Sequence, residues 1–278
     1  MSEKVLKKKY ILPIVIIILL LILILLVKIA YDNIYNQCKG NRCNNFILKF
    51  AEENEKEIFS IDKIVYFSSC DGQTNINANT SFTISDLYQY TDIAIFINNT
   101  NSSGEFTAEN TLKNVSLDNI SFELLPSVGT PNLYYKNLND FASSKYEEKN
   151  KIDNSINFST TSEDSIDYST PVLYNNCANP ICLSYVNSNI KKDYTLMENL
   201  SNISYNGLLL KYCNITLNSI ACRISLNVNI TNNLDEIYTC PLKLQIPLST
   251  ENTTIYDGTL ILKDSTNYKF IKNIKKDS

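Results

Sequence analysis

One long apolar run near the N-terminal end limits what this chain can fold into. Residues 11–27 carry no charged side chain, and Tyr10 and the Ile29–Ala30 pair extend the run to about 20 residues. A helix that rises about 1.5 Å per residue crosses the roughly 30 Å hydrocarbon core of a bilayer in that length. The run therefore predicts one transmembrane helix over residues 10–30, with membrane lipid as its partner.

A cleaved signal peptide is the alternative for this run, because lysines at positions 4 and 7–9 precede it. The apolar part of a signal peptide usually spans about 7–15 residues and ends before a small-residue cleavage site. This run is longer, and Lys28 follows it. An uncleaved signal anchor is therefore favoured, and the N-terminal lysines place residues 1–9 in the cytoplasm as a short tail.

Eight cysteines all lie after the apolar run. An even number on the far side of a membrane anchor indicates disulfide bonds in an oxidising compartment. We therefore expect a single-pass protein of the cell membrane, with the bulk of the chain extracytoplasmic. Local spacing suggests four bridges, although many other pairings are open. They are Cys38–Cys43, Cys177–Cys182, Cys213–Cys222 across a hairpin and, as the long-range remainder, Cys70–Cys240.

Zinc binding by cysteines is the alternative to these disulfides. The two arms of such a site are Cys38 with Cys43 and Cys177 with Cys182. The chain contains no C-x-x-C pair, and it has no histidine that could complete a mixed site. Disulfides are therefore favoured, and no metal ligand is predicted.

After residue 61 the pattern of the chain becomes that of β-strands. In the segment 220–231 every second residue is apolar, which is typical of a sheet with one wet face. The segment 238–248 repeats this pattern, and its two prolines fall on the outward face, which indicates an edge strand or a bulge. Shorter strands are predicted over residues 64–67, 93–97 and 120–124.

Three dipeptides predict hairpin turns: Asp71–Gly72, Asn206–Gly207 and Asp257–Gly258. Each lies between two strand-like runs, and an Asn or Asp followed by Gly readily takes the positive φ angles of a tight hairpin. Many short strands joined by turns predict an all-β ectodomain. We expect an antiparallel β-sandwich, Ig-like or jelly-roll-like, on the single N-terminal transmembrane helix.

The domain organisation follows from these patterns. Residues 31–60 form a membrane-proximal stalk that is partly helical, and residues 61–272 form the sandwich. The polar stretch 142–170 is a surface loop of one domain or a linker, and a linker would separate two halves, 61–140 and 171–272. Residues 273–278 form a basic tail.

Composition and motifs exclude several classes of function. Without histidine the chain has no Ser-His-Asp or Cys-His catalytic site, and it contains no Gly-rich phosphate loop. Its 25 basic and 29 acidic residues give no surplus of positive charge for nucleic acid. The sequence predicts no catalytic residue, no bound cofactor and no enzyme.

Two short segments are weak candidates for ligand contacts. Asp71, Asn75, Asn77 and Asn79 offer spaced oxygen atoms, but they lack the carboxylates of a calcium loop. The segment 174–180 is rich in turn-forming residues, and a structural loop is the favoured interpretation.

Three hypotheses for function remain. The favoured one is a surface binding or adhesion module, with a protein or carbohydrate as its ligand. The alternative is a structural or assembly component of the cell envelope. The third is an envelope hydrolase that uses two carboxyl groups across a cleft, about 5–9.5 Å apart.

Overall fold

The computed structural model describes residue 28 and residues 57–78, 81–99, 104–125, 128–197, 207–246, 260–264 and 268–273. Several predicted parts lie outside the described residues: the cytoplasmic tail 1–9, the membrane segment apart from Lys28, and the stalk up to residue 56. Cys38 and Cys43 lie in this part of the stalk. Within the described ranges, no helix is long and apolar enough to cross a membrane. The chain divides into two compact units, 1–56 and 57–278, and the fold below is that of the second.

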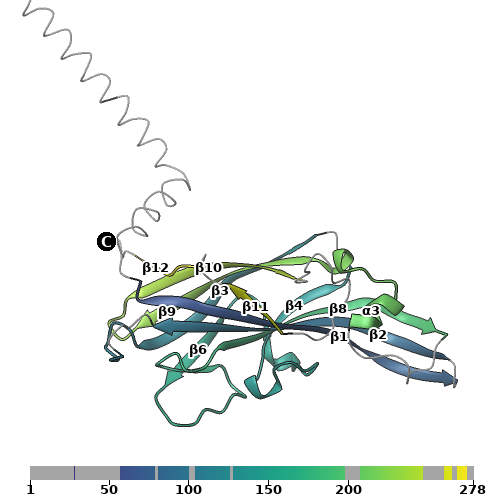
Figure 1. The fold of residues 1–278 in the computed structure, drawn as a ribbon, viewed down its shortest axis with the longest axis horizontal. Helices are drawn as coiled ribbons and strands as arrows, with labels where there is room; N and C mark the ends of the chain where they lie inside the picture. The colour runs from purple at the N-terminus through teal and green to yellow at the C-terminus, as the bar shows by residue number, and fades with distance from the viewer. Residues whose placement is uncertain are drawn as a thin grey trace, which may run out of the picture. The chain divides into compact units, whose positions relative to one another are not determined.

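The second unit is all-β and contains two six-stranded sheets (Figure 1). Sheet A has the order β11 (Leu260–Asp264), β1 (Phe59–Ala78), β2 (Ser81–Asn99), β8 (Ile181–Leu196), β4 (Thr130–Tyr135) and β5 (Lys151–Ile152). Sheet B has the order β12 (Ile271–Lys272), β10 (Ile237–Ile246), β9 (Cys222–Asn232), β3 (Leu112–Leu124), β6 (Ile156–Thr161) and β7 (Val172–Tyr174). Among the described strands, only β6 and β7 pair in parallel.

The main core lies between the two sheets. Ile64, Ile93 and Leu183 reach it from sheet A, while Val228 and Leu242 reach it from sheet B, and all five are almost fully buried. Such burial of apolar surface is the main favourable term in folding. The all-β class expected from the sequence is therefore confirmed.

Each sheet combines strands from both ends of the second unit. In sheet A, β2 pairs with β8 along most of its length. In sheet B, β3 pairs with β9. The two stretches 61–140 and 171–272 therefore do not form separate sheets.

The period of two in β9 and β10 is confirmed. In β9 every second side chain is buried, from Cys222 to Asn232, and β10 follows the same pattern from Tyr238 to Ile246. Pro241 points outward and lies opposite Asn227 of β9, whereas β12 pairs with β10 only at Tyr238 and Thr239 within the described residues. Pro241 has no N–H to donate, and it lies outside the part of β10 that is described as paired with β12.

Two of the three predicted hairpin turns are wrong. Asp71 and Gly72 lie inside β1, opposite Tyr88 and Leu87 of β2. A Cβ atom at Gly72 would come within 2.8 Å of the Asp86 carbonyl oxygen, so this glycine permits a close approach of two strands.

The second wrong turn is Asn206–Gly207. Gly207 begins the short helix α3 (Gly207–Tyr212), and a 3₁₀ helix, η4 (Leu217–Ile220), follows it. Cys213 and Cys222 are therefore not opposite each other in a hairpin. The third turn, Asp257–Gly258, lies outside the described residues.

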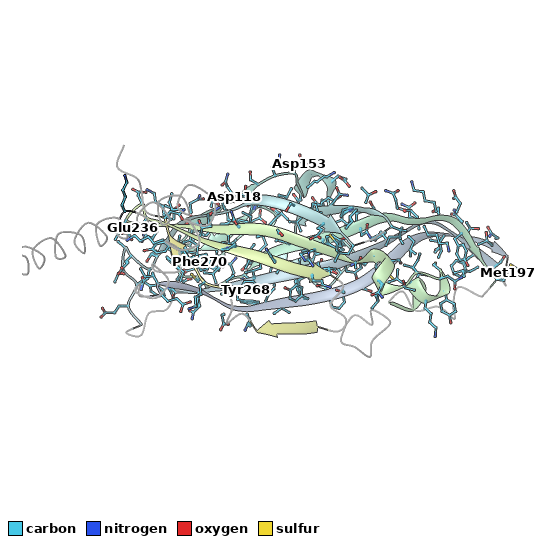
Figure 2. The ribbon with its side chains drawn as sticks, turned by 90° about the horizontal axis from the view of Figure 1, so that it is seen from above. Asp118, Asp153, Met197, Glu236, Tyr268 and Phe270 are labelled. Atoms are coloured by element: carbon cyan, nitrogen blue, oxygen red, sulfur yellow. The ribbon has the colours of Figure 1, made fainter. Side chains whose placement is uncertain are left out.

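A second, smaller core lies at one end of the β1–β2 hairpin, where α3 packs beside β1 (Figure 1). This is the end at which Met197 follows β8, opposite the end that holds Glu236 and Phe270 (Figure 2). We call this core the hairpin-end cluster. It consists of Cys70, Phe82, Ile84, Leu87, Ile190, Leu196, Leu209, Leu210, Cys213 and Ile220.

Candidate functional site

A hollow of about 440 Å³ lies where β2, the end of β4 and the segment that follows β4 meet. That segment contains two 3₁₀ helices, η1 (Leu138–Asp140) and η2 (Glu148–Asn150), before it joins the sheet again as β5. We call this site the tyrosine hollow. It is lined by Tyr88, Tyr135, Lys136, Asn137, Asp140, Ser144, Lys145, Tyr146, Glu147 and Asn150.

A group of tyrosine rings, packed edge to face or at a tilt, stands beside the hollow, and two of its members, Tyr88 and Tyr146, line the hollow. The half-buried ring of Tyr146 lies 4.9 Å from the ring of Tyr134 and 5.9 Å from that of Tyr88, centroid to centroid. Tyr90 and Val186 complete the cluster beneath them and are buried. Aromatic pairs at these distances stabilise each other beyond the area that they bury.

The phenol groups of this cluster are held by hydrogen bonds and stay protonated at neutral pH. The Tyr134 hydroxyl donates to Oε1 of Glu148 over 3.0 Å, and the Tyr88 hydroxyl bonds with Ser144 and Asp71. Burial is the main cause that raises the pKa of Tyr88, Tyr134 and Tyr146 above the ordinary value of tyrosine. The wall therefore presents neutral rings and hydroxyl groups, not phenolates.

A buried ion pair fixes the start of the segment that forms the other wall. The Lys136 ammonium lies 3.2 Å from Oδ2 of Asp92, and it also donates to the carbonyl oxygens of Ser143 and Lys145. Asp92 accepts further hydrogen bonds from the Ser184 hydroxyl (2.6 Å) and the Ala142 N–H (2.9 Å). The pair thus ties the segment to the outer face of β2 and β8.

Burial raises the pKa of Asp92, while the Lys136 charge and the hydrogen bond from Ser184 act in the opposite direction. Because the carboxylate and the ammonium are both satisfied by neighbouring groups, this pair can remain in the interior despite the cost of desolvation. The arrangement is that of a structural clamp beside the hollow.

A second hollow, of about 450 Å³, includes the predicted loop 174–180 and the exposed ring of Phe106. The side chains of this loop are occupied in holding it together. Asn179 accepts from the Tyr174 N–H and donates to the Val172 carbonyl, while Asn176 accepts from the Ala178 N–H. This agrees with the structural interpretation of the loop and favours the tyrosine hollow as the ligand site.

The six described cysteines are not joined by disulfides within the described part of the chain. Cys182 lies on the outer face of β8 near Asp92 and Lys136, whereas Cys177 packs against the main core, so these two cysteines do not form the predicted bridge. Cys222 and Cys240 both belong to the main core, but they are six positions apart along the β9–β10 ladder, since Cys240 lies opposite Val228.

Cys70 and Cys213 share the hairpin-end cluster. The structure therefore separates Cys70 from its predicted partner Cys240 and separates Cys213 from Cys222.

The described residues give no support for calcium binding by the segment that begins at Asp71. Asp71, Asn75 and Asn77 are strand residues of β1; Asp71 accepts a hydrogen bond from the Gly72 N–H, and Asn77 donates to Thr83. Across the described residues, no three Cys, Asp or Glu side chains gather in a way that could hold a metal ion.

Comparison of the chain with protein-family models, with curated proteins and with solved structures found no match. Function is therefore inferred from the geometry of the site.

The residues of the tyrosine hollow were not singled out from the sequence. Tyr88 and Tyr90 carry one usable signal, since two tyrosines two positions apart in a strand point to the same face. Glu147 and Glu148 are both exposed, and Glu148 also accepts the hydrogen bond from Tyr134.

Proposed function

We propose that this chain is a membrane-anchored, extracytoplasmic β-sandwich protein that binds a saccharide in the tyrosine hollow. The observation that carries the proposal is the half-buried Tyr146, whose ring packs against Tyr134 at a tilt and against Tyr88 edge to face, at the wall of a hollow with a polar rim. Ligand sites commonly combine apolar or aromatic walls with a few placed polar groups.

The chemistry of the rim supports a saccharide. Tyrosine rings offer flat apolar faces for the C–H groups of a sugar ring, and their hydroxyls can hydrogen-bond. Asn137, Asn150 and Ser144 add neutral donors and acceptors to the same hollow. Its charges are balanced, because Asp140 bonds with Lys145 over 3.1 Å and Glu147 with Lys149 over 2.6 Å. A neutral, hydroxyl-rich ligand fits this rim better than a strongly charged one.

The hollow is also pre-organised. The Asp92–Lys136 pair and the bond from Tyr134 to Glu148 hold both ends of the segment after β4 before any ligand arrives. Binding then does not need to order this segment, which lowers the entropic cost of association.

The location outside the cytoplasm is supported by the apolar run over residues 10–30 and by the eight cysteines that follow it. A binding module held at the membrane by one helix presents its sheets and loops to the surroundings. The rim carboxylates Asp140 and Glu147 are each paired with a lysine, which favours binding of the saccharide over its hydrolysis.

The test is binding of the full chain, in lipid nanodiscs, to an array of neutral, acidic and amino-sugar oligosaccharides. We expect a neutral oligosaccharide to bind, and Tyr146→Ala to weaken its binding about 10-fold or more, or about 1.4 kcal/mol. Tyr212→Ala is the matched control, because Tyr212 is exposed on α3, outside the hollow.

Melting temperatures of both variants show whether the fold survives. If no saccharide binds, or if both tyrosine variants bind equally well, the proposal is wrong, and the assembly role in the envelope becomes the leading hypothesis.

A further inference from the structure

Two cysteines that are 143 positions apart in sequence meet at one turn of α3. Cys70 of β1 and Cys213, the residue after α3, are 1% and 0% exposed and belong to the same small cluster. Cys70 forms hydrogen bonds with the backbone of Leu210 and Leu209. The Cys213 N–H donates to the Leu209 carbonyl over 3.1 Å. Both residues therefore lie beside the same turn of backbone, and the Cys213 thiol is near enough to Cys70 to contribute to raising its pKa.

We propose that Cys70 and Cys213 form a disulfide bond that ties α3 to β1. This inference rests on the proposed extracytoplasmic location. A dithiol–disulfide exchange forms the bond: one thiol loses a proton and attacks a sulfur of a donor disulfide, which releases one donor thiol. The second cysteine then displaces the other donor thiol from the mixed disulfide. Two protons and two electrons pass from the two cysteines to the donor disulfide, which is reduced to two thiols.

The other described cysteines are poorly placed to compete for either thiol. Cys182 lies on the outer face of β8, and Cys177, Cys222 and Cys240 pack with the main core rather than with the hairpin-end cluster. Cys70 and Cys213 are the two described cysteines that share a cluster outside the main core.

Burial lowers the reactivity of both thiols in the packed cluster. Burial raises the pKa of Cys70 to about 12 and that of Cys213 to about 11, although Lys191 lowers the latter slightly. Thiolates are the reactive species, so exchange in the packed cluster is slow. Since Cys70 and Cys213 are 1% and 0% exposed, packing of α3 shields the bond from reductants.

The bond has a clear structural task. The helix α3 has six residues, and helices of that length are not stable without tertiary contacts. A covalent link from Cys213 to the central part of β1 holds this helix over Leu87 and the other apolar residues of the cluster. It also closes a long loop, which removes entropy from the unfolded chain.

The test begins with the full chain, taken from the membranes of intact cells with free thiols blocked by alkylation. Digestion without reductant should yield one peptide pair joined through Cys70 and Cys213, and reduction should separate it. Recovery of both residues alkylated, or of either joined to a different cysteine, overturns the inference.

Variants separate the bond from packing of the two side chains. We expect Cys70→Ser, Cys213→Ser and the double variant to lower the melting temperature by the same amount, about 10 °C, because each removes the same bond. Reductant present during folding should bring the wild type to that level, while Cys182→Ser, the buried control, should keep the response to reductant. Additive losses that reductant does not reproduce would contradict the bond.

The same digest, combined with amine labelling of intact cells, distinguishes the two proposals. If amine labelling places the ectodomain outside the cytoplasm and Cys70 and Cys213 are still alkylated, only the disulfide is wrong. If labelling places the domain inside the cytoplasm, the proposed function fails with it.

Discussion

The Nζ atom of Lys136 lies 3.2 Å from Oδ2 of Asp92, with side chains that are 2% and 0% exposed. The two residues are 44 positions apart in sequence: Asp92 lies in β2, and Lys136 directly follows β4. Removing two charges from water is costly, and here the cost is offset by their attraction and by hydrogen bonds to Ser184, Ser143 and Ala142. The pair joins the segment that forms one side of the tyrosine hollow to the sheet beneath it.

Loss of the ammonium should destabilise the fold strongly. Lys136→Met leaves the Asp92 carboxylate buried without its main partner, so we expect the free energy of unfolding to fall by about 3–5 kcal/mol. Urea unfolding followed by circular dichroism measures this. Lys145→Met is the control, since the Lys145–Asp140 pair is exposed and should contribute about 0–1 kcal/mol. Equal effects of the two substitutions would contradict the clamp.

Gly129 should not tolerate a side chain. Its φ angle is +105°, and a Cβ atom would lie 2.2 Å from Oδ1 of the buried Asn187, whose amide donates to the Val128 carbonyl. We expect Gly129→Ala to lower the free energy of unfolding by about 1–3 kcal/mol. Gly104 also has a positive φ, but nothing lies within 4 Å of its Cβ position, so Gly104→Ala should cost less. The reverse order in chemical unfolding would count against this packing.

Glu236 should give the fold part of its sensitivity to acid. Hydrogen bonds from Lys272 and then Asn232 hold its pKa below the ordinary value of 4.5. The native state therefore favours the carboxylate, and this contribution is present above pH 4.5 and is lost as the pH falls through the lowered pKa. Between pH 5 and about 3, wild-type stability should fall more steeply than that of Glu236→Gln. Parallel profiles of unfolding free energy against pH would contradict this assignment.

Local patterns predicted the regular part of the fold. The alternation in β9 and β10 depends only on which side chains face the core, so the period of two located both strands and their buried faces. The Asp71–Gly72 turn failed because the same dipeptide also serves a strand where two backbones come close, and only the partner at Asp86 distinguishes the two cases.

The site could not be predicted in the same way. Tyr88 and Tyr90 lie on one strand face, but Tyr146 reaches them because the segment after β4 returns to the sheet. Asp92 precedes the apolar run 93–97 within β2, and nothing local indicates that Lys136 neutralises it. Contacts over such separations are set by the tertiary fold and leave no period in the sequence.

The central claim is that the ectodomain faces outward from an anchored N-terminus, and amine labelling tests it most directly. Intact cells are treated with a membrane-impermeant amine reagent, and the modified lysines are mapped before and after lysis. Lys145 and Lys149, whose side chains are 75% and 71% exposed, should be labelled in intact cells, while Lys136 should stay unmodified as the buried control. The lysines at positions 4 and 7–9 should react only after lysis. Labelling of the N-terminal lysines in intact cells, with Lys145 and Lys149 protected until lysis, would contradict the account.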